Sequence, residues 1–311
     1  MWLSGRERSQ LSSEPRCERD NGADMGRIRV RTALICAVTC GAAFAAVVPV
    51  ASAAPGRSVL ATSTTTSICK SAKRPRFAAW LSRGLERAVH GRDSRLGLAV
   101  SDPRLDLTCA LHQGWRFDAA STIKATIISA LLLKQHGPSH LAKAQRSLAW
   151  LMITQSDNDA ATDLWNEVGM RDMQRFLDKA GMKHTVLSEA WGLTQETAGD
   201  ELRLLRLLAA PGKMLSTASR QYVLSLMAHV IPSQRWGVPD GAPSGVTVSV
   251  KNGWLPYPTS RNWHVNSLGV FRGHDISYQI AVLTSGNSSE NYGIATIQAA
   301  ARVINRDIAK G

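Results

Sequence analysis

Residues that hold metals are scarce in this sequence, which has 5 cysteines and 8 histidines among 311 residues. His136 and His140 have the spacing of a helical ligand pair, but Gly137 and Pro138 between them break the helix that would align their rings. No other histidine or cysteine clusters with them. We therefore expect no metal and no other cofactor.

Acidic residues are also few: 24 Asp and Glu stand against 37 Lys and Arg, a net charge of +13. Such an excess raises the question of a nucleic-acid partner. The basic residues are scattered, however, with one dense cluster from Lys70 to Arg76, and no nucleic-acid motif or internal repeat accompanies them. We expect no nucleic-acid partner, and a monomeric basic protein that works near an anionic cell wall.

Long apolar runs are absent except for one, from Ala33 to Val50. Three arginines between Arg27 and Arg31 precede it, and the small residues Ala51–Ala53 follow, which is the pattern of a secretory signal peptide with its cleavage site. A retained membrane anchor is the alternative, but no charged stop-transfer cluster follows the run. We expect a secreted, extracytoplasmic protein that meets the membrane only through the signal peptide before cleavage.

The residues before this signal are polar, mixed in charge and foreign to a signal peptide. Met25 lies where a short basic segment should begin. Our hypothesis is that Met25 is the true start, so that residues 1–53 comprise a misassigned start and a cleavable signal. Mass spectrometry of an unprocessed precursor that contains residues 1–24 would contradict it.

The remaining chain divides into a linker and one folded domain. Residues 54–75, rich in Ser, Thr and basic side chains, are typical of a linker, and residues 76–311 carry regular periodicity. Helical spacing begins at Phe77 and ends near His90. Alternation and turn residues predict strands at 96–101, 105–112, 246–250, 263–271 and 276–284. Helices are predicted at 122–135, 139–152, 159–168, 171–180, 198–209, 217–229 and 292–308.

This order predicts an α+β fold. The antiparallel sheet, of about five strands, comes from residues 76–120 and 245–311 and is flanked by the N- and C-terminal helices. Residues 121–244 form an inserted all-helical subdomain.

Two segments have the pattern Ser-x-x-Lys, at Ser121–Lys124 and at Ser67–Lys70. On a helix, a lysine three residues after a serine lies on the same face and can take its proton. Ser121 opens the strongly apolar segment Ile123–Leu133, whereas Ser67 lies in a Thr/Ser-rich stretch without periodicity. We therefore choose Ser121 as the candidate nucleophile.

Two further motifs follow in the chain. Ser156–Asn158, with the sequence Ser-Asp-Asn, falls between two predicted helices directly after Leu151–Gln155. Lys251–Gly253, with the sequence Lys-Asn-Gly, ends the alternating strand 246–250. Their order and their positions at the ends of elements resemble the active site of class A β-lactamases and penicillin-binding proteins, over residues 76–308.

The resemblance implies roles for the first two motifs. Ser121 would be the nucleophile and Lys124 its base, and the apolar surroundings of Lys124 would favour its neutral form. Ser156 would relay the proton to the leaving nitrogen, and Asn158 would hold the side-chain amide of the substrate. Asp157 would fix the loop.

The resemblance also implies a substrate-binding edge. Lys251 would attract a carboxylate, Gly253 would allow the strand edge to approach the ligand, and the N–H of Trp254 would complete an oxyanion hole. Arg261 resembles an additional carboxylate-binding arginine, although an exposed, solvated arginine fits equally well. Asn252 would also bind the substrate, but it departs from the Thr or Ser of the family; its amide can still donate a hydrogen bond, with different geometry.

A second departure concerns the release of the acyl group. Class A enzymes carry a Glu-x-x-Leu-Asn segment whose glutamate activates water, and residues 187–194 lack that pattern. Glu189 is the candidate for such a base, since Glu196 is interpreted as the first turn of a helix. Without a base the acyl-enzyme should persist or pass its acyl group to another acceptor.

Two cysteines, Cys69 and Cys109, remain after signal cleavage. In an oxidising compartment they form either a disulfide or two buried free thiols.

Together these features predict an exported serine hydrolase that acts through an acyl-Ser121 intermediate on a β-lactam or a related amide. The alternatives are a D-alanyl-D-alanine carboxypeptidase or related cell-wall peptidase, and a penicillin-binding sensor without turnover.

Overall fold

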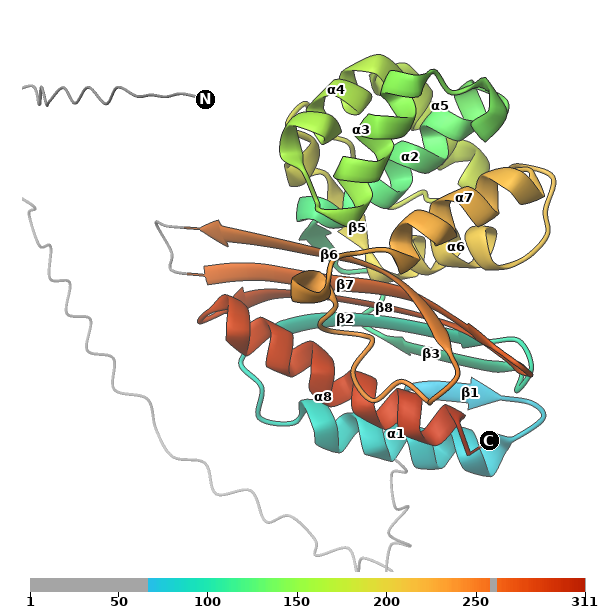
Figure 1. Ribbon diagram of the computed structural model, residues 1–311. Helices are drawn as coiled ribbons and strands as arrows, with labels where there is room; N and C mark the ends of the chain where they lie inside the picture. Colours follow the sequence, from blue (N-terminus) through green and yellow to red (C-terminus); the bar gives the residue numbers. More distant parts are fainter. Residues whose placement is uncertain (1–66, 258–261, 311) are drawn as a thin grey trace, which may run out of the picture. The chain divides into compact units, whose positions relative to one another are not determined.

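The computed structural model describes residues 67–257 and 262–310 (Figure 1). The predicted signal peptide, residues 54–66 of the predicted linker and Arg261 lie outside these residues.

The central feature is a six-stranded sheet in which every neighbouring pair is antiparallel. Its strands, in spatial order, are β1 (Cys69–Ser71), β3 (Leu107–Leu111), β2 (Arg95–Asp102), β8 (Ile276–Asn287), β7 (Asn262–Gly273) and β6 (Thr247–Tyr257). Five of them are the predicted strands. The predicted α+β architecture is therefore confirmed, and β6 forms one edge of the sheet.

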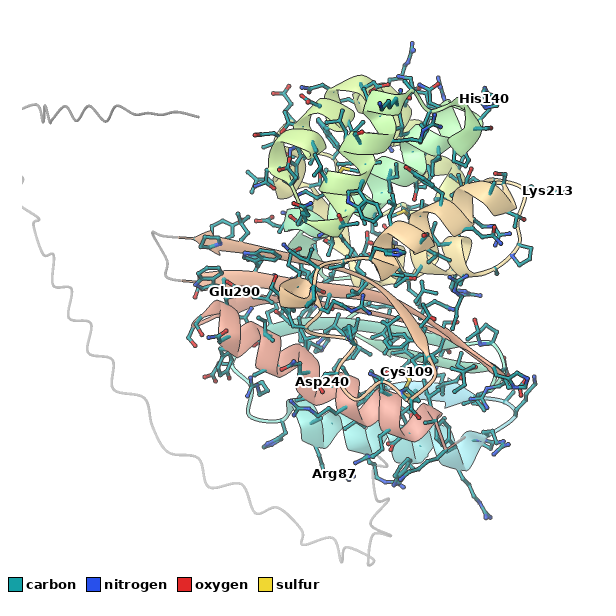
Figure 2. The ribbon with its side chains drawn as sticks, in the orientation of Figure 1. Arg87, Cys109, His140, Lys213, Asp240 and Glu290 are labelled. Atoms are coloured by element: carbon teal, nitrogen blue, oxygen red, sulfur yellow. A yellow bond between two sulfur atoms is a disulfide. The ribbon has the colours of Figure 1, made fainter. Side chains whose placement is uncertain are left out.

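The sixth strand corrects the predicted linker. Cys69–Ser71, assigned to the linker from composition, pairs with β3 in the register that places Cys69 opposite Cys109. A disulfide joins these two buried side chains. Figure 2 labels Cys109, which belongs to the apolar core between the sheet and the terminal helices. Of the two alternatives for the cysteines, the structure has the disulfide.

Two helices from opposite ends of the domain cover one face of the sheet. They are α1 (Pro75–Val89) and α8 (Glu290–Ile308), and they lie side by side in Figure 1. Gly84 allows their close approach, because a Cβ atom on it would lie 2.9 Å from Val303 Cγ1. This layer holds the ends of the domain together.

The other face of the sheet meets the helical part of the domain, chiefly through α6. Its helices are α2 (Ile123–Lys134), α3 (Lys143–Thr154), α4 (Asn158–Val168), α5 (Met170–Ala180), α6 (Ala198–Ala209) and α7 (Thr217–Ala228). Helix α2 is buried on every side from Ile123 to Leu132 and packs against α3, α4, α5 and α7. An apolar helix without a polar face is stable only in such a central position.

Four single helical turns connect these elements: η1 (Ala120–Thr122), η2 (Pro138–His140), η3 (Trp191–Leu193) and η4 (Pro232–Gln234). No helix in the described part of the chain is long and apolar enough to cross a membrane.

A small second sheet was not predicted. It pairs β4 (Arg116–Asp118) with β5 (Gln195–Thr197), and Phe117 lies opposite Glu196. Strands of three residues are too short to show an alternating pattern in the sequence. This pairing brings the segment after α5 against the residues that precede Ser121.

Candidate active site

Ser121 lies in η1, directly before α2. The preceding residue, Ala120, has a φ of 49°, a left-handed conformation that costs a residue with a side chain about 1–3 kcal/mol. Ser121 is partly exposed, whereas Thr122 and the first three turns of α2 are buried. The turn therefore presents Ser121 at the end of a helix that is otherwise enclosed.

Lys124 connects the first motif to the second. Its side chain is fully buried, and its ammonium donates to the Ser156 carbonyl and to Asn158 Oδ1, both at 2.7 Å. The Ser156 hydroxyl lies 3.3 Å from the same nitrogen. Burial lowers the pKa of Lys124 to about 7, against the opposing charge of Asp157. Near neutral pH this lysine is therefore partly neutral and able to accept a proton.

The second motif is held by its own middle residue. Asp157 caps α4, with its carboxylate accepting a hydrogen bond from the Ala160 N–H at 2.7 Å. Ser156 has a φ of 59°, which turns the chain sharply before the cap. Asp157 thus fixes the loop, as the resemblance implied, and leaves Ser156 and Asn158 directed at Lys124.

Lys251, on β6, reaches the same serine. Its buried ammonium donates to Ser156 Oγ at 2.9 Å and to the Asn252 carbonyl at 2.8 Å. Burial, with the neighbouring charge of Lys124, lowers the pKa of Lys251 well below its usual value. The structure thus brings residues of all three motifs to one hydroxyl, that of Ser156.

Gly253 places β6 against the turn that carries Ser121. A Cβ atom at this position would lie 2.8 Å from Ala119 O, Ser121 N and Thr122 N. The close approach that requires glycine here is thus to the backbone of η1, whereas the resemblance implied an approach to the ligand. Any side chain at Gly253 would move the nucleophile.

Asn252 differs from the expectation that its amide serves a ligand. Both Nδ2 hydrogens are used internally, donating to Gln234 O at 2.8 Å and to Trp236 O at 2.9 Å. Its Oδ1 is buried and has no donor among the described residues. The neighbouring Trp254 packs edge-on against Trp236, with ring centroids 5.9 Å apart. Asn252 therefore braces the loop at Gln234–Trp236.

Trp191, which the sequence did not single out, covers Lys124. The ammonium lies 4.8 Å from the centre of the indole ring, and Trp191 Nε1 donates to Thr162 Oγ1 at 3.1 Å. Glu189, two residues earlier, is exposed. The structure thus places an indole ring against Lys124 and leaves Glu189 exposed.

Glu196 is the second residue that sequence reasoning missed. It was interpreted as the first turn of a helix, but it lies in β5, and Thr197 is the residue that caps α6. Glu196 and Glu201 are both fully buried, and we call them the acid pair. Burial raises the pKa of both carboxyls, and so does the negative charge of Asp200. Glutamates are rarely fully buried. The sequence therefore gave no reason to expect that Glu196 is buried.

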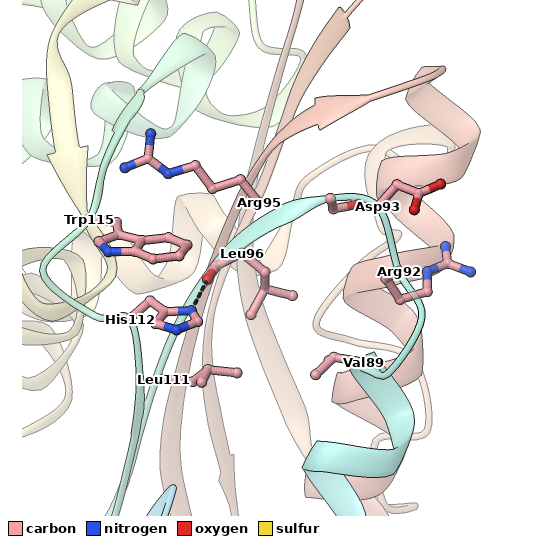
Figure 3. A pocket seen from close by; sticks show the side chains of 9 residues that line it. Val89, Arg92, Asp93, Arg95, Leu96, Leu111, His112 and Trp115 are labelled. Carbon is pink, nitrogen blue, oxygen red and sulfur yellow. Dashed lines mark hydrogen bonds between the residues drawn. The ribbon is translucent and has the colours of Figure 1, made fainter. Parts of the chain in front are cut away.

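A pocket of about 380 Å³ lies elsewhere, between the start of β2 and the end of β3 (Figure 3). His112 stacks on one side of it against Trp115 at 3.8 Å, and the Arg95 guanidinium lies 4.8 Å from the Trp115 ring. His112 Nδ1 donates to Leu96 O at 3.2 Å. None of the motif residues lines this pocket, so it is not part of the candidate site.

No group of three or more His, Cys, Asp or Glu within residues 67–257 and 262–310 is arranged to hold a metal ion.

Known structures share this fold. A class A beta-lactamase from Bacteroides cellulosilyticus has a TM-score of 0.65 at 17% identity, over 74% of this chain and 98% of its own. A beta-lactamase from Sphaerobacter thermophilus gives 0.63 at 19% identity, over 74% and 97%. PBP-A gives 0.64 at 20% identity, over 75% and 97%, and a PBP-A variant has been solved as an acyl-enzyme complex with penicillin G.

At the level of sequence, no curated protein matches this chain. A model of the beta-lactamase enzyme family matches residues 136–308, which include the second and third motifs and begin after Ser121. This match spans more than half of the 311 residues of the chain. The chain therefore belongs to the beta-lactamase enzyme family and is a serine hydrolase of the β-lactamase type.

Proposed function

We propose that this protein is an exported enzyme that cleaves a β-lactam or a related cell-wall amide through an acyl group on Ser121. The observation that carries the proposal is the contact of Ser156 Oγ with two buried ammonium groups, at 3.3 Å from Lys124 and 2.9 Å from Lys251. Two lysines so close and so little solvated disfavour double protonation. One of them can therefore serve as a base at neutral pH.

Acylation follows from this arrangement. Neutral Lys124 takes the proton of Ser121 as Oγ bonds to the amide carbon, and the carbon–nitrogen bond then breaks. The leaving nitrogen receives a proton through Ser156, which lies between the lysines. The balance is one new ester bond, one broken amide bond and one proton moved from oxygen to nitrogen.

The substrate would be held by the edge of β6. When Lys124 is neutral, Lys251 can keep its proton and provide positive charge for a substrate carboxylate, and Arg261 would add a second charge. Asn158 would bind the substrate's side-chain amide, and the backbone N–H groups of Ser121 and Trp254 would stabilise the oxyanion. Gly253 sets the distance between β6 and Ser121, and Asn252 supports this edge through the loop at 234–236.

Deacylation is the step for which we find the weakest catalytic support among the described residues of the site. Trp191 covers Lys124, and Glu189 is exposed. Water would therefore reach the ester without a well-placed base, and the acyl-enzyme should be long-lived. This observation favours the second candidate, a D-alanyl-D-alanine carboxypeptidase or related peptidase, over a fast β-lactamase; a sensor without turnover is the limiting case.

Export is supported by the signal-like segment before residue 54 and by the disulfide between Cys69 and Cys109, because such bonds persist in oxidising compartments.

The test uses two β-lactam probes on the purified protein. A fluorescent penicillin should label it covalently, and Ser121→Ala should abolish the label. Ser67→Ala, in the second Ser-x-x-Lys segment, is the matched control and should label normally, because Ser67 precedes the edge strand β1 and lies on no helix. Labelling that survives Ser121→Ala would refute the proposed nucleophile.

Hydrolysis of a chromogenic cephalosporin then separates the candidates. Slow release of the penicillin label, with little cephalosporin turnover, supports the peptidase, and cleavage of a D-alanyl-D-alanine peptide would establish it. Rapid turnover would instead identify a β-lactamase and contradict the inference drawn from Trp191.

A further inference from the structure

The acid pair lies directly behind the turn that carries Ser121, and its link to that turn is Thr122. The Thr122 hydroxyl oxygen is 2.6 Å from Ala119 O and 2.8 Å from Glu196 Oε2. A hydroxyl has one hydrogen to donate, and a carbonyl can only accept. If Thr122 donates to Ala119 O, the hydrogen in the contact with Glu196 must come from the carboxyl group.

The hydrogen-bond donors available to Glu201 lead to the same conclusion. As carboxylates, Glu201 and the second Glu196 oxygen would have no donor among the described residues. A proton on Glu201 allows it to donate to Glu196. A chain of donors would then run from Glu201 through Glu196 and Thr122 to Ala119 O, with one oxygen of Glu201 still without a donor among the described residues.

Surrounding charges favour these protons. Within the described residues no Lys, Arg or His forms an ion pair with either acid, and Asp200 is the charged group that acts on both. Arg203 is held by Asp200 at 2.9 Å, and Arg116 donates to His184 O. Other charged or titratable groups on the elements around the pair include Lys124 on α2, Asp118 on β4, Arg95 on β2, His264 on β7 and Arg220 on α7.

The chain ends at an atom that shapes the nucleophile. Ala119 O also accepts from Asn266 Nδ2 at 3.2 Å, and it is one of the atoms against which Gly253 packs. The next residue, Ala120, is in the left-handed conformation, which persists only where its surroundings hold it. Loss of the Thr122 hydrogen bond would therefore loosen the turn at Ser121.

We propose that Glu196 is a positioning residue: as a neutral acid backed by Glu201, it keeps the Thr122 hydrogen on Ala119 O and so holds Ser121 in place. Ionisation of Glu196 would draw that hydrogen to the carboxylate and leave Ala119 O with its two longer contacts, to Thr122 N and Asn266 Nδ2, both at 3.2 Å. Acylation should then fall at alkaline pH. This consequence rests on the proposed role of Ser121, whereas the protonation of Glu196 does not.

The first measurement is independent of catalysis. The infrared spectrum of the protein at neutral pH should show the carbonyl stretch of a protonated carboxylic acid, and Glu196→Gln should remove a component of it. The same result is expected in a Ser121→Ala background. Spectra in which Glu196→Gln removes only a carboxylate band would overturn the proposal, even if penicillin labelling proceeds as expected.

The second measurement is the acylation rate against pH, from about pH 6 to pH 10. Glu196→Gln keeps a donor to Thr122 and cannot ionise, so it should retain most of the neutral rate and lose the alkaline fall. Glu196→Leu has no donor and should acylate about 10-fold more slowly or worse at every pH, a loss equivalent to one hydrogen bond. An alkaline fall that is identical in wild type and Glu196→Gln would refute the positioning role.

Thr122 supplies the companion test if Glu196→Leu does not fold. Thr122→Ser keeps the hydroxyl and should retain the wild-type pH profile, whereas Thr122→Val removes it and should slow acylation to a similar degree as Glu196→Leu. Equal rates for the two Thr122 variants would show that the hydroxyl plays no part.

Discussion

The two buried titratable clusters near Ser121 differ in sign and in use. Lys124 and Lys251, the lysine pair, converge on Ser156, and burial lowers their pKa values. The acid pair, Glu196 and Glu201, supports the turn behind Ser121, and burial raises its pKa values. Each cluster is driven toward its neutral form.

This difference explains why the acid pair does not contact the lysine pair. A carboxylate placed against Lys124 would stabilise the ammonium, raise the pKa of the lysine and remove its ability to accept a proton. The nearest opposing charge, Asp157, is occupied with the cap of α4. Desolvation therefore sets both the base and the supporting acid, and neither is neutralised by an ion pair.

Removal of the lysine base should give the largest effect. Lys124→Ala is expected to slow penicillin acylation by about 10²–10⁴-fold, the usual contribution of a general base. Stopped-flow measurement of label formation checks this value. Lys70→Ala, which changes an exposed lysine in the other Ser-x-x-Lys segment, should have no effect. A loss below about 10-fold for Lys124→Ala would assign the base to another group.

Gly253→Ala should have the next largest effect, because the added Cβ would press on η1, the turn that carries Ser121. Overpacking costs about 1–3 kcal/mol, and displacement of Ser121 should slow acylation about 10- to 100-fold. Gly212→Ala is the matched control, since nothing lies within 4 Å of its added Cβ. Acylation at the wild-type rate in folded Gly253→Ala would show that β6 does not position the nucleophile.

Trp191→Leu should alter the lysine pair alone. Two effects oppose each other: loss of the indole removes a cation–π attraction of about 0.5–2 kcal/mol, whereas access of water favours the ammonium. The pKa of Lys124 falls from 10.5 to about 7, and burial is the main cause, so solvation should win. The pH midpoint of acylation should rise by about one unit, which slows labelling severalfold at neutral pH.

Leu193→Ala, at an exposed position in the same turn, should leave that midpoint unchanged. A midpoint that falls in Trp191→Leu would mean that the indole acts mainly through its attraction for the cation.

The sequence predicted the elements and the motifs, because both depend on local pattern. The predicted helix at 198–209 coincides with α6, and the predicted strands of the hairpin correspond to β7 and β8. The apolar segment after Ser121 indicated the buried helix α2. Elements of three residues, such as β1 and β4, could not be predicted, since their stability comes from partners distant in the chain.

Side-chain environment was harder to predict than position. Asn252 was expected to face a ligand, but its amide binds two carbonyls of a loop about 16 to 18 residues away in sequence. Glu196 was interpreted from its place before a helix, and its burial depends on β4, which the pattern did not reveal. Charge state is a property of the assembled environment, so neither cluster's pKa values could be inferred from residue types alone.

Glu201→Gln should have the smallest effect on acylation near neutral pH. Its effect on the pH dependence of stability tests whether the acid pair, unlike a surface carboxylate, is protonated. Because the folded pKa of Glu201 is raised, its contribution is fully present below the unfolded pKa and is lost as pH rises toward the folded pKa. Each proton retained only by the folded protein makes the free energy of unfolding fall by about 1.4 kcal/mol per pH unit. Urea unfolding at several pH values above about 5 should show a shallower fall in Glu201→Gln than in wild type, by up to that amount. Parallel curves would mean that Glu201 is ionised in the folded protein, and the acid pair would then share its charge state with ordinary surface carboxylates.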